Sequence, residues 1–223
     1  MKSHRKRVGV LISGRGSNMA ALIEAAASPH YPAEIALVIA NKTDAAGLQR
    51  AQAAGIATCV IDHKAYATRE AFDDAVHAAL VEAHIDLVAL AGFMRIQSEH
   101  FVDRWLGRQL NIHPSLLPAF KGLHPHRQAL EAGVRISGAS VHFVTHELDG
   151  GPIVAQAAVP VVDGDSVDSL AARILIAEHR LYPLALRLVA LEKARLVNSR
   201  VAFDQQYPPD NATPILLSPR TDF

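Results

Sequence analysis

The chain has 223 residues, enough for one ordinary domain that buries about 70 per cent of its unfolded surface. It carries 22 Lys and Arg against 22 Asp and Glu, so it lacks the positive field with which nucleic-acid-binding proteins displace counterions. The single cysteine, Cys59, cannot form an internal disulfide, and no apolar run reaches the roughly 18 residues of a membrane span. We therefore expect a cytoplasmic protein with neither a nucleic-acid nor a membrane partner.

The first half of the chain alternates short β-rich apolar runs with longer alanine-rich segments at helical spacing. Strands are predicted near residues 7–12, 34–40, 58–61 and 86–90, and helices near 17–27, 44–54 and 68–83. Asp44 and Thr68 are predicted helix N-caps. This alternation is typical of βαβ units around a parallel sheet, and it predicts an α/β fold.

After Arg95 the rhythm of the sequence changes. A short helix is predicted from Ser98, followed by strands near residues 108–111, 139–144 and 153–160, with Pro-, Gly- and His-rich loops over 113–122 and 147–152. A long amphipathic helix is predicted from Ser166, and Pro183 should bend or interrupt it. The Pro-rich tail from Tyr207 is expected to be loose. Because no composition break divides the chain, we predict one domain over residues 1–223.

A glycine-rich turn follows the first predicted strand and opens the first predicted helix. Its sequence is Ser13-Gly14-Arg15-Gly16-Ser17-Asn18. Free N–H groups and the helix dipole at such a turn attract a phosphate, and open α/β sheets bind ligands at the carboxyl ends of their strands. The turn lacks the third glycine of the dinucleotide fingerprint and the lysine of a P-loop. Phosphate binding is favoured, with an ordinary strand-to-helix turn as the alternative.

The sequence Asn111-Ile112-His113-Pro114 places an amide and an imidazole two residues apart in an extended segment. Their side chains therefore face the same side, and Pro114 keeps His113 extended. Asp149, in a later glycine-rich turn, could keep the imidazole protonated and orient it. The residues alone leave open a hydrogen-bonded loop histidine and an ordinary Asp-Gly turn.

Further polar residues allow other sites. His142 and His146 would share a strand face and His124 lies near His126, but there is neither a His-Glu-x-x-His motif nor a cysteine pair, so we expect no metal. Arg69 and Arg95 could each clamp a carboxylate of a substrate. Glu178, on the last long predicted helix, is by default a solvated residue with room for a substrate contact.

Three segments resemble the phosphoribosylglycinamide formyltransferase family: Gly92-Phe93-Met94-Arg95-Ile96, Asn111-Ile112-His113-Pro114-Ser115-Leu116-Leu117-Pro118, and Ser140-Val141-His142-Phe143-Val144 running to Leu148-Asp149-Gly150-Gly151. The likeness covers roughly residues 8–191. The second segment with a downstream Asp-Gly is specific for folate-dependent formyltransferases and their hydrolase relatives. His146 stands where the family usually has an acidic residue.

The resemblance implies a doubly wound, mostly parallel, Rossmann-like sheet with a phosphate-binding half over about 7–95, a folate-binding and catalytic half over about 96–191, and a tail over about 192–223. It brings together three catalytic residues, Asn111, His113 and Asp149. It also implies two binding sets, Gly16, Ser17, Asn18 and Glu178 for the ribonucleotide, and Arg69, Met94, Arg95, Ile96, Gln97 and Asn111 for 10-formyltetrahydrofolate.

The activity implied by the resemblance is formyl transfer from 10-formyltetrahydrofolate to the amine of N1-(5-phosphoribosyl)glycinamide, a step of purine biosynthesis. Small-molecule substrates are its expected partners, and it requires no metal and no covalent enzyme intermediate. The alternatives are a formyltetrahydrofolate hydrolase, a methionyl-tRNA formyltransferase and a non-catalytic nucleotide-binding module. We expect the first two to need added domains and the neutral charge to disfavour tRNA. A homodimer is left open.

Overall fold

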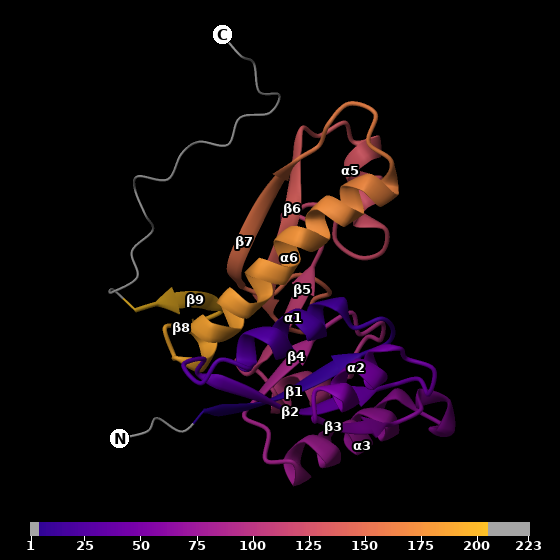
Figure 1. The fold of residues 1–223 in the computed structure, drawn as a ribbon, viewed down its shortest axis with the longest axis vertical. Coiled ribbons are helices and arrows are strands. Elements are labelled where there is room, and N and C mark those ends of the chain that lie inside the picture. Colours follow the sequence, from indigo (N-terminus) through magenta and orange to yellow (C-terminus); the bar gives the residue numbers. More distant parts are fainter. Residues whose placement is uncertain (1–4, 205–223) are drawn as a thin grey trace.

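The computed structural model describes residues 5–204, which form a seven-stranded sheet and a separate hairpin (Figure 1). The sheet contains β1 (Lys6–Ile12), β2 (Ala33–Ala40), β3 (Ala57–Val60), β4 (Leu87–Leu90), β5 (Gln109–His113), β6 (Ile136–Phe143) and β7 (Ile153–Pro160). Its strand order is β3-β2-β1-β4-β5-β6-β7, parallel from β3 to β5 and antiparallel at β6 and β7. The predicted mostly parallel sheet is confirmed.

Helices cover both faces of this sheet, as in a doubly wound fold. They are α1 (Ser17–Ala26), α2 (Gly47–Ala53), α3 (Arg69–Glu82), α4 (Glu99–Arg104), α5 (Pro125–Glu131) and α6 (Val167–Ala190), with a 3-10 turn η1 (His63–Ala65). The core beside α1, α2 and α6 is separate from the core beside α3 and α4. Figure 1 shows α6 running along the sheet on the α1 side.

Strand β1 supplies both cores because its residues alternate between the two faces. Val8, Val10 and Ile12 pack in the α1 and α6 core, whereas Leu11 packs in the α3 and α4 core, and all four are fully buried. A strand buried on both faces is apolar throughout, which explains the continuous run seen in the sequence.

The order of strands reverses between β1 and β4, because the chain moves outward from β1 to β3 and then returns to the other side of β1. The turns after these two strands are tied together. Ser13 N donates to Gly92 O at 3.1 Å, and Met94 N donates to Ser13 Oγ at 2.8 Å. Open α/β sheets bind ligands at such a switch point.

One of the two predicted N-caps is confirmed, because the Thr68 side chain accepts from Ala71 N. The helix predicted from Ser98 is also present, and the Ser98 side chain accepts from Phe101 N. The prediction of Asp44 as an N-cap is wrong, because α2 begins at Gly47 without a side-chain cap.

Tertiary packing moves the start of α2. Gly47 N donates to Gly14 O at 3.0 Å, and a Cβ on Gly47 would lie only 2.6 Å from Ile12 Cδ1 and 3.3 Å from Gly16 Cα. The close approach of two turns therefore decides where this helix begins.

Pro183 was predicted to bend or interrupt the last long helix, and it lies inside α6 without interrupting it. A proline inside a helix costs about 3 kcal/mol. The buried residues around it, which include Tyr182, Ala185 and Leu186, offset this cost by packing on the sheet. The Tyr182 hydroxyl also lies 3.0 Å from Leu90 O and 3.1 Å from Leu110 O, which ties α6 to β4 and β5.

Helix α5, which follows the Pro- and Gly-rich loop, was not predicted, and neither was the hairpin of β8 (Ala194–Val197) and β9 (Arg200–Phe203) inside the predicted tail. The predicted strand β6 begins at residue 136 rather than 139. Asn198 and Ser199 join this hairpin with φ of 48° and 59°, as two-residue turns of twisted hairpins require. The tail from Tyr207 lies outside the described residues. No helix between residues 5 and 204 is long and apolar enough to cross a membrane.

Candidate active site

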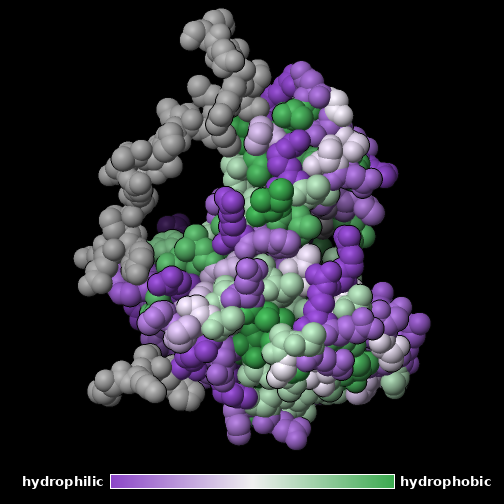
Figure 2. Space-filling view, in the orientation of Figure 1, coloured by the Kyte–Doolittle hydropathy of each residue, from purple (hydrophilic) through white to green (hydrophobic). Residues whose placement is uncertain are grey.

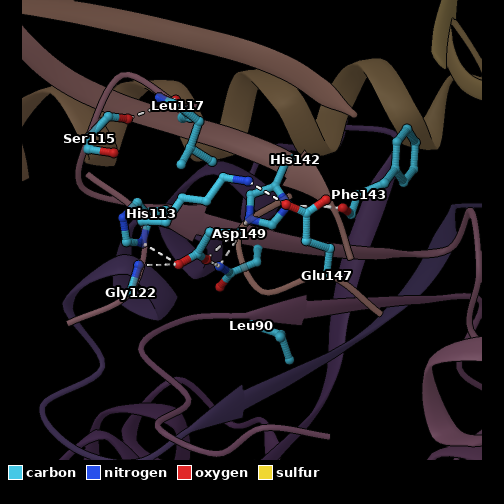
Figure 3. Close-up of polar contacts among 12 residues, drawn as sticks. Leu90, His113, Ser115, Leu117, Gly122, His142, Phe143, Glu147 and Asp149 are labelled. Carbon is cyan, nitrogen blue, oxygen red and sulfur yellow. Dashed lines mark hydrogen bonds and ion pairs between the residues drawn. The ribbon is translucent and has the colours of Figure 1, made fainter. Parts of the chain in front are cut away.

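The antiparallel pairing of β5 with β6 builds the centre of the candidate site. Asn111 lies opposite His142 and His113 lies opposite Ser140 in this pair. Asp149 comes from the turn between β6 and β7, and Figure 3 shows its carboxylate between the rings of His113 and His142. The structure thus brings together the three predicted catalytic residues.

The His113 ring lies between two hydrogen-bond acceptors. Its Nδ1 is 3.4 Å from Asp149 Oδ2, and its Nε2 is 2.9 Å from Phe120 O. A carboxylate and a carbonyl can only accept, so both contacts are satisfied together only when the imidazole carries two protons. The side chains of His113 and Asp149 are each 7 % exposed, so little water competes for these contacts.

Asp149 accepts or approaches donors on both of its oxygens. Gly122 N donates to Oδ2 at 2.8 Å, Asn111 Nδ2 lies 3.5 Å from Oδ1, and His142 Nε2 lies 3.7 Å from Oδ1. Burial by itself would raise the pKa of the Asp149 carboxyl, but the His142 side chain, the Gly122 N–H and the charge of His113 together hold that pKa below its usual value. The carboxylate is therefore kept ionised.

The loop after β5 is fastened to β6 and to the Asp149 turn. Ser140 Oγ donates to Ser115 O at 2.7 Å and accepts from Leu117 N at 3.0 Å. Lys121 pairs with Glu147 at 2.7 Å on the surface, beside the Gly122 bond to Asp149. The loop that was predicted from its Pro and Gly content is therefore held at several points.

The predicted phosphate turn and Glu178 also meet. Gly16, with φ of 66°, precedes Ser17 at the start of α1, where no side chain caps the helix. Asn18 Nδ2 donates to Glu178 Oε2 at 2.8 Å across to α6. Burial raises the pKa of Glu178, and the hydrogen bond from Asn18 only partly offsets this. Glu178 is buried, so the default of a solvated residue is wrong.

The predicted folate-binding segment follows β4 at the switch point. Met94 and Ile96 are 70 % and 61 % exposed, although both are large and apolar. Arg95 Nε and Gln97 Nε2 are buried and have no hydrogen-bond partner among the described residues. Buried donors normally have partners, so this segment is suited to a polar ligand.

Arg69 begins α3, and the guanidinium of Arg95 lies 5.3 Å from the centre of the Phe72 ring. Asp73, also on α3, accepts from Ser98 N at 2.6 Å and is 3 % exposed. Burial raises the pKa of Asp73, while Ser98 and the charges of Arg69 and Arg95 act against that shift. Sequence reasoning missed Asp73, although an acidic residue on the apolar stripe of a helix is a recognisable signal.

His142 and His146, one of the histidine pairs considered for zinc, separate in space. His142 faces Asn111, whereas His146 Nε2 lies 2.8 Å from Asp103 Oδ1 on the surface. Between residues 5 and 204, no group of three or more His, Cys, Asp or Glu side chains is arranged to hold a metal ion. His142 belongs instead to the centre around Asp149, a placement that only the strand pairing reveals.

Known proteins share both the sequence and the fold. A family model described as formyl transferase matches residues 6–186. A phosphoribosylglycinamide formyltransferase from Escherichia coli (strain K12) is 49 % identical over 202 residues, which cover 90 % of this chain and 95 % of that protein. The human trifunctional purine biosynthetic protein adenosine-3 is 54 % identical over 186 residues, which cover 83 % of this chain but only 18 % of that much longer protein.

Solved protein structures also resemble this chain in fold and sequence. Glycinamide ribonucleotide transformylase 1 from Symbiobacterium toebii has a TM-score of 0.87 at 48 % identity, with 90 % of this chain and 94 % of that chain covered. Phosphoribosylglycinamide formyltransferase from Brucella melitensis has a TM-score of 0.81 at 56 % identity, with 83 % and 96 % covered. The chain therefore belongs to the formyl transferase family, and within it to the phosphoribosylglycinamide formyltransferases.

Proposed function

We propose that this chain transfers the formyl group of 10-formyltetrahydrofolate to the amine of N1-(5-phosphoribosyl)glycinamide, a step of purine biosynthesis. The observation that carries the proposal is the convergence of Asn111, His113 and Asp149 in a buried centre at the carboxyl end of β5. Family membership and the names of the relatives support the choice of substrates.

The proposed reaction needs donors for a developing negative charge. The substrate amine attacks the formyl carbon, the carbonyl electron pair moves to the formyl oxygen, and the bond from that carbon to N10 then breaks. The amine loses one proton and N10 gains one, so no oxidant or metal enters the balance. Asn111 donates through its amide. The doubly protonated His113 donates to the oxyanion through Nε2, which gives up its contact with Phe120 O when the substrate is bound, and delivers a proton toward N10.

Asp149 acts on His113 in this scheme. Its carboxylate accepts from Nδ1, which orients the ring and favours the charged form that the oxyanion requires. The Gly122 N–H bond fixes the carboxylate in turn. The ring is thereby held in place as the charge develops, and only the partner of Nε2 changes.

The remaining predicted residues are assigned to binding. Gly16, Ser17 and Asn18 would hold the phosphate at the uncapped start of α1, and Glu178 would contact the glycinamide part. Arg69 and the segment from Met94 to Gln97, together with Asn111, would hold the formyl donor. Three buried atoms have no hydrogen-bond partner within residues 5–204, and they fit polar ligands at the two proposed binding sites. They are Asn18 Oδ1 on the ribonucleotide side, and Arg95 Nε and Gln97 Nε2 on the formyl-donor side.

One assay separates this function from its alternatives. Release of tetrahydrofolate only when the ribonucleotide is present supports the transferase. Release without the ribonucleotide indicates a formyltetrahydrofolate hydrolase, and no release indicates a binding module.

The proposal includes a cytoplasmic protein that acts without metal on small molecules. It also divides the chain into a phosphate-binding half over about residues 7–95 and a folate-binding and catalytic half over about 96–191. A homodimer is the assembly that the sequence leaves open, and light scattering measures it.

A further inference from the structure

The side chain of His142 lies in the proposed catalytic centre, yet the chemistry above gives it no part. It is only 2 % exposed and stands directly opposite Asn111 in the β5–β6 pair. Opposite residues of an antiparallel pair project from the same face with Cβ atoms about 5 Å apart. The pairing itself therefore brings this imidazole to the Asn111 amide.

The surrounding backbone holds the His142 ring in one orientation. Its Nδ1 is 2.9 Å from Phe143 O, and because a carbonyl only accepts, Nδ1 must carry a hydrogen. Only glycine fits at position 151, since a Cβ there would lie 1.8 Å from Phe143 O and 3.2 Å from His142 Nδ1. The β6–β7 register shifts between Val141 and His142, an irregularity of the kind that re-aims a side chain.

The opposite edge of the ring therefore faces the centre with a defined chemistry. In the neutral ring the hydrogen stays on Nδ1 and Nε2 keeps a lone pair that can accept, whereas a protonated ring would also donate from Nε2 to Asp149 Oδ1, 3.7 Å away. Asn111 Nδ2 lies 3.2 Å from this Nε2 and can donate one of its two hydrogens to it. Asn111 Nδ2 is also 3.5 Å from Asp149 Oδ1, so the amide nitrogen is on the side where Asp149 meets His113. If the Asn111 amide were rotated by half a turn, its oxygen rather than its nitrogen would face the Asp149 carboxylate.

We propose that His142 is a positioning residue that accepts one hydrogen of the Asn111 amide and so leaves the other, which approaches Asp149 Oδ1 in the structure, for the formyl oxygen. This inference rests on the proposed function, because that function assigns Asn111 to the oxyanion. Loss of one such donor costs roughly 10²–10³ in kcat. Loss of the orientation of the Asn111 amide, with the amide still present, is expected to lower kcat by a somewhat smaller factor.

Two substitutions of His142 separate this role from packing. In His142→Gln the new amide lies near the place of Nε2, whereas in His142→Asn it lies near the place of Nδ1, beside Phe143 O. The proposal expects His142→Asn to lower kcat about 10- to 100-fold with both KM values changed less than about threefold, and His142→Gln to keep most of kcat. Wild-type kcat in His142→Asn, or equal losses in both variants, would overturn it.

A double-mutant cycle with Asn111→Ala tests whether the effect passes through Asn111. Measured in single turnover with enzyme in excess, His142→Asn should have little further effect once Asn111 is alanine. Losses that multiply would overturn the proposal. Val141→Ala is the control for lost stability, because Val141 is fully buried in the core outside the site, and its kcat should equal that of the wild type.

The same measurements distinguish the inference from the proposed function. Wild-type enzyme that does not transfer formyl groups overturns both. Wild-type enzyme that transfers them, with His142→Asn as active as the wild type, overturns only the role of His142.

Discussion

Oδ2 of Asp149 serves two partners at once, the Nδ1 atom of His113 at 3.4 Å and the N–H of Gly122 at 2.8 Å. The carboxylate thereby joins the histidine at the end of β5 to the loop that follows it. The other nitrogen of the same ring reaches Phe120 O in that loop, so ring, loop and carboxylate orient one another. Replacement of Asp149 therefore tests both the charge and the geometry of the centre.

We expect Asp149→Asn to lower kcat at least about a hundredfold, with much smaller changes in substrate binding. An asparagine keeps the size of the side chain but removes the negative charge opposite His113. The charge-assisted contact to the ring is then lost, which weakens the stabilisation of the oxyanion. Steady-state kcat and KM of the variant check this, and a kcat equal to that of the wild type would contradict the role of Asp149.

Gly16→Ala should raise the KM for the ribonucleotide strongly and leave the KM for the formyl donor nearly unchanged. A Cβ at this position would lie 3.1 Å from Gly47 Cα, next to the uncapped N–H groups of α1. Gly55→Ala is the matched control, because Gly55 has a similar φ of 73° but open space around it. Steady-state kinetics of both variants decide the point, and equal effects on the two substrates would argue against a local phosphate site.

Glu178→Gln should bind the ribonucleotide less well and yet be more stable than the wild type at neutral pH. Burial raises the pKa of Glu178 in the folded protein. The contribution of Glu178 to stability is therefore fully present below its pKa in the unfolded chain, about 4.3, and is lost as pH rises through its higher pKa in the folded protein. Glutamine has no charge to bury and still accepts from Asn18. Thermal unfolding at pH 4 and pH 7 measures the difference, which should be larger at pH 7. A variant less stable at pH 7 would show that the charge is well solvated.

Asp73→Ala should raise the KM for the formyl donor, because it removes the acceptor that holds Ser98 N directly after the predicted donor-binding segment. A buried N–H without a partner costs about 1–3 kcal/mol, so the unfolding temperature should fall as well. The neighbouring Asp74→Ala is the control, since the Asp74 side chain is 59 % exposed and pairs with Arg104 on the surface. Kinetics in which both variants behave alike would exclude a role for Asp73 in positioning.

Catalysis should survive removal of metal ions. The proposed chemistry uses only protein donors, and the two histidines that could share a zinc ion face different partners, Asn111 for His142 and Asp103 for His146. Dialysis against a strong chelator, followed by the turnover assay, should leave kcat unchanged. Activity that is lost and then restored by zinc alone would contradict the assignment of these histidines.

Much of the fold could be predicted because local interactions decide it. Alternating apolar runs predicted β1 to β5, and the N-cap preference of threonine predicted the helix start after Thr68, where the side chain does accept from Ala71 N. The structure differs from the prediction at the start of α2 and at Pro183, where α6 is not interrupted. At both places packing between distant segments overrides the local preferences.

The sequence by itself determined which residue types the candidate site contains and, through the family resemblance, which of them to group. It could not show that Asn18 donates to Glu178 across 160 residues, or that His142 faces Asn111 rather than sharing a metal with His146. Strand pairing and helix packing decide those contacts, because side chains far apart in the chain meet only when the sheet forms. The burial that raises the pKa of Glu178 and the donors that lower that of Asp149 likewise exist only in the folded chain.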